Sequence, residues 1–327
     1  MSHKGEKRKY KVTNWSSYNN SLQQRGSLSI VFTKDFVDQW YSSDVRKGRG
    51  RPFKYSDLCI RILLEIRYLF KLQYRQLVGF VTSLFEKMDL NLEVPDYTQI
   101  CRRSAQLKLP SLRKGLSNSG KAKSGKVLVF DATGLKIYGE GEWKVKKHGK
   151  ERGRIWKELI ITLDLKSRDI IDCELTYPGA SEPEYAERVL RDLHEEGVEV
   201  DSIFGDGSYD TIKLSYYCDA HNIQCGVPPN KNAVLTEEKY RNVHESICSR
   251  DDRIKFIRKY GVDEWKKVSG YHQRSLVENA IYRYKKIFSD RLSSRNSKNM
   301  LMEVYTRWSL INKFNKFSLP KTTVVEA

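Results

Sequence analysis

The 327-residue chain lacks the features of a membrane or secreted protein. No apolar run approaches the ~18 residues that a membrane-spanning helix requires. Residues 1–15, MSHKGEKRKYKVTNW, lack the apolar core of a secretory signal. The six cysteines form no CxxC pair, which is typical of reduced, buried thiols and not of a disulfide framework. We therefore expect a cytoplasmic protein without a membrane partner, long enough to form two domains.

Acidic residues are scarce in the first part of the chain. Residues 1–126 contain 25 lysines and arginines against 10 acidic residues, a net charge of +15. Residues 127–327 contain 34 basic against 31 acidic residues. A strongly basic part indicates a polyanionic partner, and nucleic acid is the first candidate. An anionic membrane surface is the alternative, but no basic amphipathic helix with exposed aromatic residues favours it.

Residues 1–110 are predicted to be helical. Apolar residues recur three and four positions apart in two segments, 34–41 and 56–88. Ser56 stands directly before the second segment, where a helix needs an N-cap. A basic loop, VRKGRGRPFKY, precedes Ser56 and contains Arg49 and Arg51.

A short basic helix is predicted at about residues 98–108, after the turn EVPDYT. Helix, turn and basic helix are what a helix-turn-helix requires, because the last helix offers side chains to a DNA groove while its arginines meet phosphates. The candidate DNA contacts are Arg102 and Arg103 on this helix, with Arg49 and Arg51 in the basic loop. The alternative is an all-helical packing domain with a solvated basic face.

The helical pattern ends at residues 111–126, which are rich in Ser, Gly and Lys and are typical of a linker. Beyond it, residues 127–327 predict a mixed α/β sheet, with three antiparallel strands followed by parallel ones and helices on its faces. The predicted strands are about 126–131, 157–166, 168–177, 200–206 and 223–229, and the predicted helices are 181–197, 211–222 and 271–286. A polar stretch at about 230–268 is expected to be a partly helical insertion.

Two aspartates occupy corresponding places in this pattern. Asp131 and Asp206 each stand at the predicted end of an apolar strand and are followed by a small residue and a turn. Ligands bind at the carboxyl ends of parallel strands. A single carboxylate there is often a helix cap, whereas two on neighbouring strands repel unless a cation lies between them.

The predicted helix 271–286, YHQRSLVENAIYRYKK, has three faces. At about 100° per residue, four polar residues fall within one arc of roughly 60°: Tyr271, Arg274, Glu278 and Lys285. Leu276, Val277, Ala280, Ile281, Tyr284 and Ile287 form the predicted core face, and Asn279, Arg283 and Lys286 face solvent. An acid flanked by bases suits phosphoryl chemistry, because the acid can complete a metal site while the bases hold phosphate oxygens. The alternative is a surface salt bridge between Arg274 and Glu278.

Other polar residues are weaker candidates. Asp164 and Asp210 also lie near strand ends and could each replace one of the two aspartates. Trp156 either contacts DNA or packs at the sheet edge, and its basic neighbours are Arg152, Arg154 and Lys157. Cys218, His221 and Cys225 form a C-x2-H-x3-C pattern, with His244 and Cys248 nearby. This pattern crosses a predicted helix and a predicted strand, which favours core packing over zinc binding.

The spacing of the polar row, Y-x2-R-x3-E-x6-K, resembles the Y-R-E-K signature of bacterial insertion-sequence transposases of the DDE class. The segment NWSSYNNSLQQRGSLSIVF resembles the N-terminal segment of that family, and KGRGRPFKYSDLCI resembles the basic segment leading into its helical domain. FDATGL, FGDGSYD and GVPPNKNAV resemble the blocks around its first two catalytic aspartates and the strand that follows. The resemblance implies a catalytic triad of Asp131, Asp206 and Glu278, with Tyr271, Arg274 and Lys285 as accessory residues.

The same resemblance implies a ribonuclease-H-like fold and a cofactor of Mg²⁺ or Mn²⁺, as two ions held by the triad. Hard oxygen ligands suit these cations, whereas zinc prefers His or Cys. It further implies binding to terminal inverted repeats, DNA cleavage, strand transfer into target DNA, self-association in a synaptic complex and a nucleoid-associated location. The rival functions are a metal-dependent nuclease without strand transfer and a catalytically silent DNA-binding repressor of the element.

Overall fold

The computed structural model describes residues 9–43, 52–113, 125–137, 156–236 and 249–325. The chain forms two compact units. The first consists of Met1–Ile100 and Leu310–Ala327, and the second is Cys101–Ser309. The boundaries predicted at residues 110 and 126 therefore differ from the observed one, and the chain returns to the first unit at its C-terminal end. No helix in the described residues is long and apolar enough to span a membrane.

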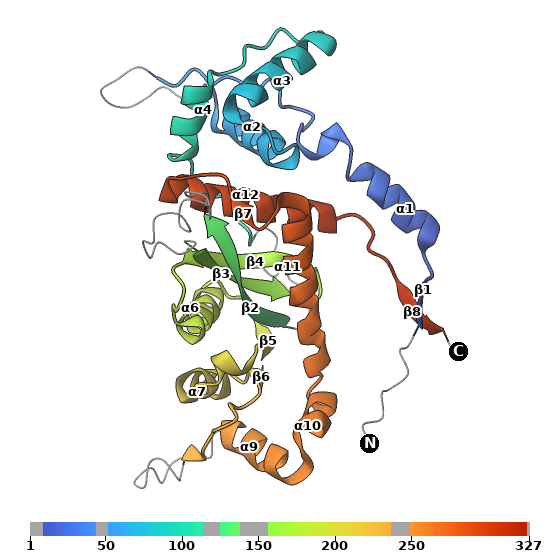
Figure 1. Ribbon diagram of the computed structural model, residues 1–327, viewed down its shortest axis with the longest axis vertical. Helices are drawn as coiled ribbons and strands as arrows, with labels where there is room; N and C mark the ends of the chain where they lie inside the picture. Colours follow the sequence, from blue (N-terminus) through green and yellow to red (C-terminus); the bar gives the residue numbers. More distant parts are fainter. Residues whose placement is uncertain (1–8, 44–51, 114–124, 138–155, 237–248, 326–327) are drawn as a thin grey trace, which may run out of the picture. The chain divides into compact units, whose positions relative to one another are not determined.

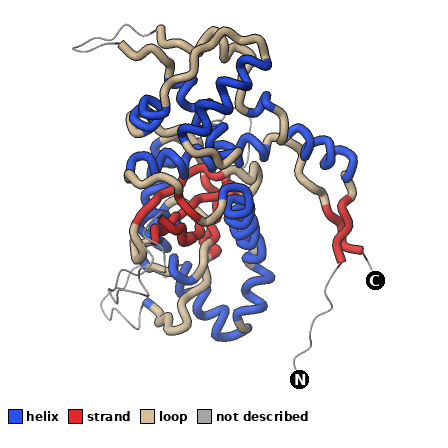
Figure 2. Tube along the Cα trace, turned by 45° about the horizontal axis from the view of Figure 1, so that its top comes forward, coloured by secondary structure: helices blue, strands red, loops and turns tan. Residues whose placement is uncertain are grey.

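The first unit is held together by contacts between the two ends of the chain. Strand β1 (Lys9–Val12) pairs antiparallel with β8 (Thr322–Val325), and Figure 2 shows the two strands side by side near the termini. Lys313 donates to both carboxylate oxygens of the largely buried Glu65 at 2.8 and 2.6 Å. Sequence periodicity carries no signal for these pairings, because the partners are 248 or more residues apart in the chain.

The helices of the first unit are α1 (Trp15–Gln24), the short 3₁₀ helix η1 (Leu28–Ile30), α2 (Asp57–Leu69) and α3 (Tyr74–Lys87). The N-cap prediction is confirmed: the Ser56 side chain accepts from the Cys59 backbone N–H at 3.0 Å. The helix predicted over 34–41 is wrong, because this segment forms turns. A segment of that length is too short to hold a helix by itself, and its Phe36 and Trp40 pack with Phe85 of α3.

The second unit contains a mixed sheet in the order β4-β3-β2-β5-β6. Its strands are β2 (Lys126–Ile137), β3 (Trp156–Asp164), β4 (Ile170–Thr176), β5 (Val200–Phe204), β6 (Gln224–Gly226) and the two-residue β7 (Arg291–Leu292), which pairs with the end of β2. Strands β2, β3 and β4 are antiparallel neighbours, while β5 and β6 run parallel to β2. This confirms the predicted mixed sheet and the ribonuclease-H-like arrangement that the resemblance implies.

Helices cover both faces of the sheet, as Figure 1 shows, with α6 (Glu182–Glu195) and α7 (Ile212–Ala220) on one face and α11 (Ser275–Phe288) on the other. The core between the sheet and α6 is formed by side chains such as Phe130, Ile160 and Val189. The polar insertion contains α9 (Ser249–Tyr260) and α10 (Val262–Val268), which confirms its partly helical character. The last helix, α12 (Ser297–Asn315), reaches β4 through the Tyr305 hydroxyl, which donates to the Cys173 carbonyl at 2.9 Å.

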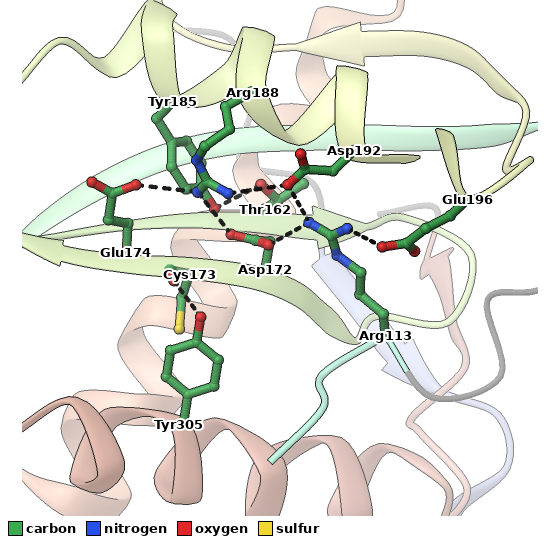
Figure 3. A network of polar contacts seen from close by, with 10 residues as sticks. All are labelled: Arg113, Thr162, Asp172, Cys173, Glu174, Tyr185, Arg188, Asp192, Glu196 and Tyr305. Atoms are coloured by element: carbon green, nitrogen blue, oxygen red, sulfur yellow. Dashed lines mark hydrogen bonds and ion pairs between the residues drawn. The ribbon is translucent and has the colours of Figure 1, made fainter. Parts of the chain in front are cut away.

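Arg113 anchors the segment predicted as a linker to the second unit (Figure 3). Its guanidinium lies 2.6 Å from Asp172 of β4 and 2.5 Å from Glu196, just after α6. Arg188 of α6 lies 3.3 Å from the other oxygen of Asp172, so this carboxylate joins two arginines. The residues predicted as a linker therefore include an anchored residue, Arg113, near their start. Residues 114–124 lie outside the described part of the chain.

Candidate active site

Asp131 and Asp206 lie in matching positions on neighbouring parallel strands. The last paired residues of β2 and β5 are Val129 and Phe204, and each aspartate comes two residues later. The prediction that the first strand ends at or just past Asp131 is wrong, because β2 continues for six more residues, to Ile137. Strand β3 explains the difference: it pairs with β2 as far as Lys136, whereas β5 stops earlier. Asp131 therefore stands at the edge where β5 leaves the sheet.

Asp206 follows β5 and caps a short turn. Strand β5 ends at Phe204, not at Asp206, and the Asp206 carboxylate accepts from the Ser208 backbone N–H at 2.8 Å. The Ser208 hydroxyl contacts the same carboxylate and lies 2.8 Å from Glu182, the first residue of α6. Sequence reasoning missed Glu182, since no motif marks it. Capping holds Asp206 in place, although its side chain is partly exposed.

Glu278 reaches the two aspartates through Arg274. The predicted helix begins as a 3₁₀ turn, η3 (Tyr271–Arg274), and continues as α11. The guanidinium of Arg274 lies 3.3 Å from Asp131, 2.8 Å from Glu278 and 4.0 Å from Asp206. The salt bridge between Arg274 and Glu278, which the sequence offered as the alternative to a phosphoryl-transfer site, is thus present. It belongs to a cluster in which one arginine joins all three candidate carboxylates.

The electrostatics of this cluster depend most on burial. Burial raises the pKa of Asp131, Arg274 opposes that shift, and the charges of Asp206 and Glu278 reinforce it. Burial also disfavours the charged guanidinium of Arg274, but its acidic neighbours raise its pKa above the usual value. The charges of Asp206 and Glu278 therefore act on Asp131 as repulsion between carboxylates predicts, and the guanidinium of Arg274 opposes their effect.

The other accessory positions differ in their surroundings. The ring of Tyr271 packs against Trp265 of α10 at a centroid distance of 5.5 Å. Burial, followed by the nearby charges, shifts the pKa of its hydroxyl, and the net change is upward. Lys285 is half-buried and makes no ion pair with any side chain that the structure describes. The predicted core face of the helix is confirmed in its centre, where Val277, Ala280 and Tyr284 are buried.

The donor set fits a hard divalent cation. Three carboxylates converge on a single positive group, and oxygen ligands of this kind suit Mg²⁺ or Mn²⁺. As the described residues lie, no three acidic, histidine or cysteine side chains form a ready metal centre. The guanidinium of Arg274 stands among the carboxylates. Its Nε is buried and has no hydrogen-bond partner in the described structure, so one donor remains for another acceptor.

The two alternative aspartates have structural partners. Asp164 is fully buried at the β3–β4 turn, where it pairs with Lys126 at 3.0 Å and accepts from the Lys166 backbone N–H at 3.1 Å. Asp210 is buried and forms a two-pronged ion pair with Arg250, at 2.8 and 3.0 Å. Neither contacts the carboxylate cluster, so neither replaces Asp131 or Asp206 in this arrangement.

The C-x2-H-x3-C pattern does not form a metal site in the described residues. Cys218 and Cys225 are buried in the core between α7 and β6. His221 stacks on Tyr217 with ring centroids 4.1 Å apart, and its ring nitrogen bonds the Tyr217 carbonyl oxygen. This agrees with the packing role favoured by the sequence. His244 and Cys248 lie outside the described residues.

The predicted DNA contacts have mixed surroundings. Helix α4 (Tyr97–Ser104) is shorter than the predicted 98–108 and contains both arginines; Arg102 is exposed, but Arg103 is buried. Trp156 lies against Gly134 of β2, where an added Cβ would come within 3.0 Å of its ring, and Lys136 lies over the same ring. Cross-strand packing thus accounts for its position. Arg49, Arg51, Arg152 and Arg154 lie outside the described residues.

Comparison with known families places all three carboxylates in one domain. A family model described as "Transposase DDE domain" matches residues 122–312, more than half of the chain, and a second with the same description matches residues 23–140. The first match includes Asp131, Asp206 and Glu278.

Solved structures show only distant likeness. The piggyBac transposase synaptic complex with hairpin DNA is 11% identical with a TM-score of 0.40, and the match covers 94% of this chain and 77% of that chain. The Drosophila P element transposase strand transfer complex is 15% identical with a TM-score of 0.35, covering 89% of this chain and 71% of that one. The Mos1 transposase paired-end complex with left transposon end is 12% identical with a TM-score of 0.23, covering 70% and 82%.

Proposed function

Since this chain belongs to the family of DDE transposases, enzymes that cleave DNA and transfer its strands, we propose that it binds the terminal inverted repeats of its own insertion sequence and moves that element. The reaction is a phosphodiester cleavage that frees a 3′-OH, followed by attack of that 3′-OH on target DNA. In the first step water displaces the 3′ oxygen from phosphorus, which leaves a free 3′-OH and a 5′-phosphate. In the second step that 3′-OH displaces the 3′ oxygen of the target strand, which leaves as a new 3′-OH. Both steps are substitutions at a phosphodiester phosphorus, so the same set of carboxylates can serve both. We further propose that the protein acts at the bacterial nucleoid.

The basic first part of the chain is proposed to hold the repeats. Its net charge of +15 over residues 1–126 attracts the DNA backbone, and Arg102 is the exposed arginine of α4. Because Arg103 is buried, its proposed contribution is to hold α4 in place so that Arg102 faces the DNA. Two ends must be processed together, so self-association in a synaptic complex is part of the proposal.

Asp131, Asp206 and Glu278 are proposed to hold two divalent cations, Mg²⁺ or Mn²⁺. The chemistry that such cations supply is activation of a water and stabilisation of the leaving oxygen. The protein contributes the placement: the sheet fixes Asp131, the cap on Ser208 fixes Asp206, and α11 presents Glu278. All three supply the carboxylate oxygens that such cations prefer as ligands.

The accessory residues of the polar row, Tyr271, Arg274 and Lys285, are proposed to hold the DNA phosphates. In the described structure the Nε of Arg274 has no hydrogen-bond partner, while its two terminal nitrogens contact Glu278 and Asp131. The planar guanidinium can hold phosphate oxygens through two bonds once it exchanges these carboxylates for DNA. Lys285 has no ion-pair partner among the described side chains, which leaves its ammonium for a phosphate. Tyr271 packs on Trp265, and the pKa of its hydroxyl responds first to burial and then to Arg274, Asp206, Asp131 and Glu278, so it is proposed to orient the reacting end.

The observation that carries the proposal is the meeting of three carboxylates on Arg274 from residues far apart in the chain. The test uses the full-length protein and DNA carrying the sequences that flank its gene. Asp131→Asn, Asp206→Asn and Glu278→Gln keep the shape of each side chain and remove one negative charge. Each variant should bind the DNA ends and lose cleavage and joining together.

The matched control is Asp263→Asn, because Asp263 is 91% exposed on α10 and has only a long contact with Lys266. It should cleave and join at the wild-type rate. Cleavage without joined products would favour the nuclease, and binding without cleavage by the wild type would favour the silent repressor. An Asp206→Asn protein that still joins DNA would overturn the assignment of the triad.

A further inference from the structure

A loop beside Asp206 is held rigidly by a buried ion pair. Residues 230–234, here called the 230–234 loop, follow β6. The Asp210 carboxylate accepts from the Asn230 backbone N–H at 2.9 Å, and Arg250 donates to the Val234 carbonyl at 3.1 Å. Since Asp210 and Arg250 also bind each other, one ion pair fixes both ends of the loop.

Burying this ion pair costs desolvation free energy, so its presence in the core needs a physical explanation. The Asp210 side chain is fully buried and that of Arg250 is 8% exposed. A buried pair is often no more stabilising than apolar residues of the same volume, because both charges lose their hydration. The Asp210–Arg250 pair instead fixes the position of the loop, because its charge-assisted hydrogen bonds hold the loop backbone. Neither Asp210 nor Arg250 contacts Asp131, Asp206 or Glu278, so the ordered element is the loop.

The side chains of the ordered loop remain outside the internal contacts. Asn230, Lys231 and Asn232 are exposed, and the side chains of Lys231 and Asn232 make no hydrogen bond or ion pair to any residue that the structure describes. A cavity of about 530 Å³ opens beside them, lined by both asparagines, Thr211 and the ion pair. A rigid backbone with free polar side chains is the arrangement of a binding surface.

The loop lies next to the candidate triad. A Cβ added to Gly207 would come within 3.2 Å of the Asn230 amide oxygen, so Asn230 packs against the residue that follows Asp206. Any phosphodiester held at Asp206 therefore brings its neighbouring nucleotides to this loop. The amide of an asparagine can donate to and accept from the edge of a base, and its pattern matches adenine best. A lysine binds the phosphates of the DNA backbone.

We propose that the 230–234 loop reads the base pairs next to the scissile phosphodiester, with Asn230 and Asn232 at the base edges and Lys231 on the phosphate backbone. This inference rests on the proposed function and deepens it, since it assigns sequence preference at the cut to residues outside the triad and the three accessory residues. The Asp210–Arg250 pair acts through the loop as a positioning element.

The experiment measures cleavage by the full-length protein on DNA ends whose base pairs around the cut are randomised. Asn232→Ala and Lys231→Ala are compared with Gln224→Ala, an exposed amide at the start of β6, and Lys255→Ala, an exposed lysine of α9. Asn232→Ala should reduce the preference at one base position by about tenfold. Lys231→Ala should weaken binding for all sequences and lower the salt slope by about 1. Both controls should keep the wild-type preference.

The randomised positions on the element side and on the flanking side are scored separately, and a change on either side supports the proposal. Thermal unfolding of each variant shows that the loop substitutions leave the fold intact. If the wild type shows a preference that Asn232→Ala retains and Lys231→Ala keeps the wild-type salt slope, the loop does not read DNA. A wild-type protein that cuts no end would instead defeat the proposed function, and this inference with it.

Discussion

Arg274 Nη2 lies 3.3 Å from Asp131 Oδ1, although 143 residues separate the two in the chain. The contact joins the start of α11 to the middle of β2 and holds the partly buried carboxylate of Asp131 beside a positive charge. The same guanidinium contacts Glu278 and Asp206, so it supplies the counter-charge that the three carboxylates need without a metal. Cations entering the site must therefore share the carboxylates with Arg274 or displace it.

Arg274→Ala is expected to bind Mn²⁺ at least as tightly as the wild type when DNA is absent, because the competing guanidinium has gone. Its engagement of DNA ends should fall, since the phosphate-binding group has gone too. Calorimetric titration with Mn²⁺ and a DNA-end binding assay measure the two effects separately. Arg274→Lys keeps the charge but not the planar fork and should recover only part of the binding. Loss of Mn²⁺ with intact DNA binding would show that the role of Arg274 is wrong.

Lys285→Ala is expected to weaken DNA-end binding without lowering stability. Lys285 has no ion pair with any described side chain, so its removal leaves no buried charge behind. Lys286→Ala, one residue along on the exposed face of α11, is the matched control and should bind like the wild type. Binding at several salt concentrations and unfolding in urea check both points. Equal binding by the two variants would remove Lys285 from the site.

Arg102→Ala is expected to weaken DNA binding and to reduce the dependence of binding on salt concentration by a slope of about 1. With one phosphate contact fewer, binding releases fewer counterions. Arg103→Ala should instead lower stability, since its side chain is buried. The full chain is the right material, because a fragment of residues 1–115 would lack Lys313, the partner of the largely buried Glu65. A salt slope unchanged by Arg102→Ala would place the DNA elsewhere.

Asp210→Asn is expected to lower the free energy of unfolding by about 3 kcal/mol, because it leaves Arg250 buried without its counter-charge. The sequence alone offers Asp210 only as a weaker candidate for the carboxylate site, and the structure instead pairs it with Arg250. Urea unfolding compares it with Asp263→Asn, which should match the wild type. Wild-type stability of the Asp210→Asn protein would mean that the ion pair does not order this part of the fold.

Asp131→Asn is expected to be at least as stable as the wild type at neutral pH. Burial, as the largest cause, raises the pKa of Asp131, so the folded protein keeps this proton at a pH where the unfolded chain has lost it. Stability therefore falls as pH rises from the ordinary aspartate pKa through the raised one, and the loss persists above that window. The neutral amide avoids it. Urea unfolding should show an advantage at neutral pH that shrinks in acid; a large loss at neutral pH would contradict the shift.

The sequence by itself determined the elements whose signal is local. The Ser56 cap, the mixed sheet of the second unit and the buried centre of the helix around Val277 follow from capping, alternation and helical spacing, which act between residues close in the chain. The positions of Asp131, Asp206 and Glu278 were predicted from a family pattern, and their meeting is consistent with that pattern.

Tertiary structure alone decided where strands stop and which charges meet. Strand β2 runs past Asp131 because β3 continues to pair with it, and no local signal reports the length of a partner strand. The return of residues 310–327 to the first unit, the burial of Arg103 and the pairing of Asp210 with Arg250 likewise depend on residues distant in the chain. The sequence gives the type of each side chain, but it does not show which group that side chain contacts in the folded protein. The contacting group decides whether a carboxylate is a candidate metal ligand, a helix cap or one half of an ion pair.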